Sequence, residues 1–217
     1  MSTVIICHIG RRRKIMICDR ITVNTQSSIR IDAGATVYFD PLEIAGEPHD
    51  ADIIFITHEH YDHYSPDDIA KLSKPDTVLV APASMNLPAS FGMKPGDTAE
   101  ISGLKVEAVP AYNKGKLFHR KANGWLGYVI EADGERIYVC GDTDATDEVK
   151  SVRCDVILVP VGGTYTMNAR EAAELVNIIK PKCAIPIHYG GIVGRKEDAV
   201  KFRKLVDASV DVIEKLF

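Results

Sequence analysis

Short apolar runs alternate with abrupt polar clusters along this chain. Four of the runs are nearly continuous and rich in β-branched residues: 51–57, 136–140, 155–161 and 183–187. Runs of this length and composition are typical of strands buried on both faces of a sheet. A polar group follows each run at once, and residues placed after such strands commonly form the functional sites of α/β proteins. We therefore expect a site along one edge of the sheets.

Other segments alternate more clearly between apolar and polar positions. Segments 28–31 and 36–39 flank Asp32-Ala33-Gly34 and predict a hairpin. Segments 104–109 and 127–131 predict further strands, the latter leading through Asp133-Gly134 into the run at 136–140.

Three helices are indicated, two of them by capping signals. Ser65 precedes Pro66 and two acids, as at a helix N-terminus. Asn168 with Glu171 forms a capping box for a helix that must end before Pro181, and a third helix begins near Lys196. Strands come first and then alternate with helices, which favours sheets covered by helices over a simple doubly wound fold. We expect residues 1–217 to form one domain.

Composition and charge narrow the function classes. The chain has 217 residues, 46% of them hydrophobic, with 26 basic and 30 acidic side chains for a net charge of −4. No overall positive field attracts nucleic acid, and the basic run 11–14 is interpreted as a solvated turn. No apolar run reaches the ~18–20 residues of a membrane span. Five cysteines without a CxxC pair favour a reducing compartment, so we expect a cytoplasmic protein.

The segment 57–63 (THEHYDH) carries the strongest chemical signal. It places three of the chain's seven histidines and a carboxylate within six residues: His58, His60, Asp62 and His63. At the end of a strand, His58 and His60 point the same way because side chains alternate with period two. The turn that follows lets Asp62 and His63 approach from another side. This donor set suits zinc, with manganese or iron as alternatives.

Two distant residues stand in comparable places. Asp142 follows the run at 136–140 behind Gly141, whose backbone freedom lets the carboxylate turn into a site. His188 directly follows the buried run at 183–187. Each signal is weak alone, since Gly-Asp is a common turn and a strand-borne histidine is often a core residue.

In this order, HxHxDH, Gly-Asp-Thr and a strand-borne His resemble the metallo-β-lactamase superfamily, over about residues 20 to 217. The resemblance implies a four-layer αββα sandwich of two mixed sheets with a dinuclear metal site at one edge. It implies that Asp40 orders the site from behind the ligands. The ligands it implies are His58 and His60 for the first metal, Asp62, His63 and His188 for the second, and Asp142 as the bridge.

A finer resemblance is to the branch of ascorbate-6-phosphate lactonases and N-acylphosphatidylethanolamine-type phospholipase D, where Pro-Ala-x-His supplies another ligand. This chain has Asn113 at that histidine's position. His119, on the loop that follows, is the nearest replacement. Three interpretations of His119 stay open: a metal ligand, a contact to the substrate, or a solvent-exposed loop imidazole. One or two metal ions are therefore expected.

The chemistry implied is hydrolysis by a metal-activated hydroxide. Asp62 and Asp142 would orient it, and His119 is the catalytic candidate for protonating the leaving group, with Tyr112 as a second. Cations on the loop favour an anionic small substrate with an ester, lactone or phosphoester bond: Lys114, Lys116, Arg120 and Lys121.

Three other functions remain open at this point. A mononuclear iron oxidoreductase would use the same fold, although His60 favours hydrolysis. A nuclease would need an additional binding arm, for which this acidic chain has little room. A non-catalytic metal-binding module is the third. The sequence leaves the oligomeric state undecided, a homo-oligomer included.

Overall fold

The computed structural model describes residues 17–216. The basic run at 11–14 and Cys7 lie outside this range. Cys140, Cys154 and Cys183 are free thiols. No helix in the described range is long and apolar enough to cross a membrane.

The first sheet has six strands in chain order: β1 (Ile21–Val23), β2 (Ile29–Asp32), β3 (Thr36–Phe39), β4 (Ile53–Phe55), β5 (Val78–Pro82) and β6 (Phe91–Met93). Strands β1 to β3 are antiparallel, whereas β3 to β6 run parallel. The expected hairpin is present, with Asp32 opposite Thr36 across the turn.

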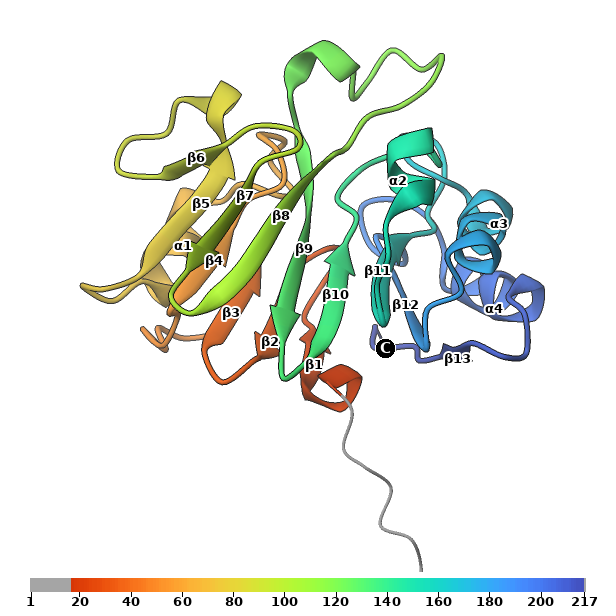
Figure 1. Cartoon of the computed structure of the whole chain (residues 1–217), viewed down its shortest axis with the longest axis horizontal. Helices are drawn as coiled ribbons and strands as arrows, with labels where there is room; N and C mark the ends of the chain where they lie inside the picture. The colour runs from red at the N-terminus through yellow and green to blue at the C-terminus, as the bar shows by residue number, and fades with distance from the viewer. Residues whose placement is uncertain (1–16, 217) are drawn as a thin grey trace, which may run out of the picture.

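The second sheet repeats this mixed arrangement with seven strands: β7 (Thr98–Ile101), β8 (Leu104–Pro110), β9 (Leu126–Ala132), β10 (Glu135–Val139), β11 (Val156–Pro160), β12 (Cys183–Ile187) and β13 (Asp211–Val212). Strands β7 to β10 are antiparallel, and β10 to β13 are parallel. The two sheets face each other (Figure 1).

Four α-helices lie outside the sheets: α1 (Pro66–Leu72), α2 (Asp147–Ser151), α3 (Ala169–Ile179) and α4 (Lys196–Leu205). Leu72 of α1 packs with Ile54 on the outer face of the first sheet. The other three helices cover the second sheet beside β11 and β12 (Figure 1). The layers are therefore helix, sheet, sheet, helices, which confirms the predicted αββα sandwich.

Capping signals correctly located two of the helices, and the third begins at Lys196, close to where it was expected. The Ser65 side chain accepts the Asp68 N–H at the start of α1, and Asn168 with Glu171 forms a complete capping box on α3. The short α2 and the strands β1, β5, β6, β7 and β13 were not predicted. Each is five residues or fewer and lacks a long periodic pattern, so tertiary packing rather than local sequence fixes it.

An aromatic cluster joins the two sheets directly below the site. Phe39 stacks on Phe55 with 4.7 Å between ring centroids, and Tyr128 of the second sheet lies 5.0 Å from Phe55. The Tyr128 hydroxyl donates to the Ile56 carbonyl at 2.9 Å. Phe39 immediately precedes Asp40, and Ile56 precedes Thr57. This cluster therefore fixes where both site-bearing loops leave the first sheet.

Replacing Tyr128 with Phe should lower the free energy of unfolding by about 1–2 kcal/mol, because the buried Ile56 carbonyl loses its donor. Tyr138→Phe is the matched control. The Tyr138 hydroxyl is equally buried, but within residues 17–216 it lacks an oxygen or nitrogen hydrogen-bond partner and has only the weakly hydrogen-bonding Cys140 thiol beside it. That variant should be neutral or slightly stabilising. Urea unfolding of both variants tests the pair, and equal losses would contradict it.

Candidate metal centre

All seven predicted site residues lie at one end of the sandwich. His58, His60, Asp62 and His63 occupy the loop after β4. His119 lies on the loop between β8 and β9, Asp142 follows β10 and His188 follows β12. The carboxyl ends of β4 in the first sheet and of β10 and β12 in the second lie at the same end of the two facing sheets, which explains why residues 130 positions apart in the chain converge here.

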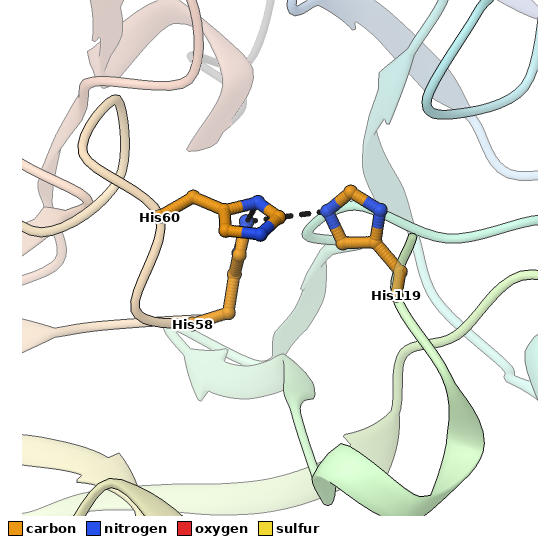
Figure 2. Close-up of side chains that lie close together, drawn as sticks. All are labelled: His58, His60 and His119. Carbon is orange, nitrogen blue, oxygen red and sulfur yellow. Dashed lines mark hydrogen bonds between the residues drawn. The ribbon is translucent and has the colours of Figure 1, made fainter. Parts of the chain in front are cut away.

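The first group of donors is three imidazoles: His58, His60 and His119. His58 Nε2 lies 3.1 Å from His60 Nδ1 and 3.4 Å from His119 Nε2, so the three rings converge from two loops (Figure 2). The buried Trp125 ring packs against all three, with centroids 4.8–5.3 Å away. The indole closes one side of this group to water.

The second group is Asp62, His63 and His188, and Asp142 lies between the two groups. His188 Nε2 is 3.4 Å from Asp62 Oδ2 and 3.4 Å from Asp142 Oδ2. The same Asp142 oxygen lies 3.2 Å from His119 Nε2, while its other oxygen lies 3.4 Å from His63 Nε2. Asp142 therefore has the position that the resemblance implied for a bridge.

Asp40 supports the centre from behind. Its carboxylate accepts the Thr57 N–H at 2.7 Å, the Thr57 hydroxyl at 2.6 Å and the His63 Nδ1–H at 2.7 Å. His58 Nδ1 lies 3.0 Å from the Thr57 hydroxyl oxygen. With Nδ1 engaged in this way, His63 and His58 direct their Nε2 lone pairs into the centre.

The backbone is strained at three of these positions. Asp40, His119 and His188 have φ values of 44°, 57° and 57°, in the left-handed region that L-residues seldom adopt. Gly141 also has a positive φ of 64°, and a Cβ atom there would lie 2.9 Å from the Leu126 carbonyl oxygen. Strain of this kind persists where surrounding packing holds a functional geometry.

The buried groups shift one another's pKa in opposite directions. Burial, aided by nearby His63, holds the pKa of His58 well below 6.5. Burial also acts against the charged form of His63, but Asp142 and Asp40 outweigh it and raise the pKa of His63 to about 9. Burial would raise the pKa of Asp142, yet the imidazoles of His188 and His63 keep it well below its usual value. Asp142 and Asp40 thus favour the positively charged form of His63 within the centre.

The donor set fits a metal ion. Within the described residues, His63 Nε2, Asp142 Oδ1 and both ring nitrogens of His188 are buried without a hydrogen-bond partner. Such unpaired groups cost about 1–3 kcal/mol each. Imidazole nitrogens and carboxylate oxygens are ligands for zinc, manganese and iron, so bound metal would satisfy the inward-facing atoms at once.

Asn113 is held by hydrogen bonds of its side-chain amide group and its backbone N–H. Its Nδ2 group donates to the Tyr165 carbonyl at 2.6 Å and to the Phe118 carbonyl at 3.2 Å, and its N–H donates to the His119 carbonyl at 2.7 Å. The amide therefore folds the loop back so that His119 enters the centre. Of the three interpretations of His119, the solvent-exposed loop is wrong, because the side chain is buried.

The positively charged side chains of the loop that carries His119 make their contacts outside the two donor groups. Lys116 Nζ donates to Asp144 at 2.5 Å and to the Thr166 carbonyl at 2.8 Å. Lys114 lies 3.5 Å from Asp147, and Arg120 is exposed with its Nε toward the Leu117 carbonyl. Lys114 and Lys116, two of the cations that favoured an anionic substrate, are therefore paired with acidic side chains.

A cavity of about 260 Å³ opens onto the metal centre. Its floor is formed by ligand candidates, and its walls by Tyr61, Phe118, Tyr165, Ile192 and Val193. Phe118, Ile192 and Val193 were not predicted as pocket residues from the sequence. The one sequence signal for these three residues is that apolar residues occur in loops beside predicted ligands. Tyr112, a candidate proton donor, is buried outside this cavity.

Comparison with known proteins agrees with this geometry. A family model described as "Beta-lactamase superfamily domain" matches residues 20–188. The chain is 34% identical to a UPF0173 metal-dependent hydrolase of Thermococcus onnurineus, covering 76% of this chain and 78% of that protein. It is 31% identical to a homologue of the same description from Archaeoglobus fulgidus, covering 87% and 91%.

A solved structure shows the same likeness. A Parabacteroides distasonis protein, classed with the metal-dependent hydrolases, superposes with a TM-score of 0.76 at 31% identity. The match covers 91% of this chain and 93% of that one.

An ion-pair network anchors the loop that carries His119. Lys121 Nζ donates to Glu148 at 2.7 Å, and the Tyr112 hydroxyl donates to the same carboxylate at 2.9 Å. The Lys121 ammonium, assisted by the Tyr112 hydroxyl, lowers the pKa of Glu148 from 4.5 to about 2.

Because the folded pKa of Glu148 lies below 4.5, its carboxylate stabilises the fold above that pH, and this contribution is lost as pH falls towards 2. In metal-free protein, Glu148→Gln should cost less than about 1 kcal/mol at neutral pH, as for partly exposed pairs. The difference from wild type should disappear near pH 2. Urea titrations across this range measure it, with Glu100→Gln on β7 as the exposed control. A pH-independent difference would contradict the prediction.

Proposed function

The chain belongs to the β-lactamase superfamily and is one of its metal-dependent hydrolases, and from this membership we propose that it cleaves an ester, lactone or phosphoester bond of a small molecule at a two-metal centre. The supporting observation is the position of Asp142, whose Oδ2 lies 3.2 Å from His119 of the first donor group and whose Oδ1 lies 3.4 Å from His63 of the second, while Oδ2 is also 3.4 Å from His188. The free cysteines further support a cytoplasmic location.

We assign the ligands from the two donor groups. His58, His60 and His119 would hold the first metal, and Asp62, His63 and His188 the second, with Asp142 shared. His119 thus takes the ligand role among the interpretations left open, because its Nε2 faces the other donors rather than the cavity mouth. The predominance of imidazole favours zinc, with manganese and iron as alternatives.

When bound, the metals would supply an activated water and polarise the scissile carbonyl or phosphoryl group. The chain's own groups position the reaction. Asp62, on the cavity wall and beside His188, is placed to accept a proton from the attacking water. Asp40 and Thr57 hold the imidazoles of His63 and His58, and Trp125 excludes water on one side. Asp142, ionised and buried, keeps the two donor groups together.

Metal content tests these assignments. Wild-type protein, purified without an affinity tag, should hold close to two metal ions per chain by elemental analysis. His119→Ala should retain about one, because the second donor group is intact. Asp142→Ala should lose at least one ion and nearly all hydrolysis, because the shared carboxylate is gone.

The matched control is His49→Ala, which removes an imidazole outside the centre and should change neither metal content nor turnover. Far-UV circular dichroism establishes that each variant is folded. Wild-type metal content and turnover in Asp142→Ala would overturn the ligand assignment. Two firmly bound ions in His119→Ala would return that residue to the role of substrate contact.

A further inference from the structure

Large apolar side chains from four separate loops surround the cavity mouth. Tyr61 is 71% exposed, Phe118 51%, Ile192 46% and Tyr165 38%. They come from the loops after β4, β8, β12 and β11, respectively, and all four line the cavity above the centre. Below we call these four residues the apolar rim. Contiguous exposed apolar surface of this kind marks a binding site, unlike single scattered residues.

Charge is absent from the walls above the centre. Among the described residues, the only ionisable groups that line this cavity, apart from tyrosine hydroxyls, are ligand candidates on its floor: His60, Asp62, His119, Asp142 and His188. No lysine or arginine of that range lines it. A charged group on a substrate, beyond the bond that reacts at the floor, would therefore lose water there without gaining a partner.

The rim is held in place by the residue that positions a ligand. Asn113 Nδ2 donates to the carbonyls of both Phe118 and Tyr165, whose rings meet edge to face with centroids 5.1 Å apart. The same Asn113 holds His119 through its N–H. Phe118 of the cavity wall and the ligand candidate His119 thus lie on one loop, and Asn113 also ties that loop to Tyr165 of the loop after β11. This part of the wall is therefore a fixed feature of the site.

We infer that the centre acts on neutral esters or lactones bearing an aliphatic or aromatic group that lies against the apolar rim. The inference rests on the proposed function and narrows its substrate class. The cavity, at about 260 Å³, is slightly smaller than the ~300–1,000 Å³ of typical ligand pockets, so the group is small, of the size of a phenyl ring or a short alkyl chain. Phosphorylated substrates with a second anionic group are disfavoured.

A homologous series of metal-binding probes measures how strongly the apolar rim binds an alkyl chain, without requiring turnover. Straight-chain alkyl hydroxamates, from acetyl to hexanoyl, should bind zinc-loaded protein with affinity rising about two- to fourfold per methylene, the upper value corresponding to ~0.8 kcal/mol for a fully buried methylene. Succinic monohydroxamate, matched in carbon number to the butanoyl probe but charged, should bind at least tenfold more weakly than that probe. Isothermal calorimetry gives both values. In parallel, kcat/KM for p-nitrophenyl acetate, butyrate and hexanoate should rise with chain length.

Variants separate the rim from general surface hydrophobicity. Phe118→Ala and Ile192→Ala should flatten the dependence on chain length while metal content stays at the wild-type level. Phe91→Ala and Ile178→Ala are the matched controls, since these side chains are 47% and 53% exposed but do not line the cavity. Both controls should keep the wild-type dependence.

The outcomes distinguish the proposed function from the inference about the substrate class. Protein that takes up no metal and binds no hydroxamate would overturn the proposed function, and this inference with it. Metal-loaded protein that binds all chain lengths equally, or prefers the charged probe, would overturn the inference alone. A rim variant that changes the oligomeric state in light scattering, with chain-length dependence unchanged, would instead assign the rim to contact between copies of this chain.

Discussion

The buried Asp142 carboxylate is the group on which the rest of the site depends. Its oxygens face His119 and His188 on one side and His63 on the other, at 3.2–3.4 Å. Five imidazoles and two carboxylates in one buried space direct lone pairs at each other, an arrangement that costs free energy unless positive charge lies between them. In the metal-free protein the pKa of His63 is raised, so a proton on this imidazole supplies part of the positive charge. The arrangement of donors therefore lowers the stability of the metal-free protein, and it keeps this space able to bind cations.

Rigid elements hold the donors in this unfavourable arrangement. The stacked rings of Phe39 and Phe55, with Tyr128 across the interface between the sheets, fix the ends of β3 and β4. From those ends Asp40 and Thr57 project and orient two imidazoles by hydrogen bonds. Left-handed backbone at Asp40, His119 and His188 shows that packing, rather than local preference, sets their directions.

The elements with strong local signals could be predicted from the sequence, as could the convergence of six donor candidates. The runs that became β4, β10 and β12 placed His58, Asp142 and His188 at one edge, because strand ends in such sheets meet there. The role of loop 113–119 could not be resolved, since its path depends on contacts between Asn113 and Tyr165, 52 residues apart. For the same reason the sequence shows the charge of the lysines of that loop but not their acidic partners across the fold.

The hydrogen bonds of Asn113 have a consequence for redesign. One amide ties His119, Phe118 and Tyr165 together, so the loop acts as a single exchangeable part that carries a ligand and a wall in fixed relation. Changing its length between Asn113 and His119 would disturb affinity for the ion and shape of the opening together. The loops with Tyr61 and Ile192 have no such tie to Asn113 among the described residues. Selectivity can therefore be diversified at those two positions while the 113–119 loop is kept whole.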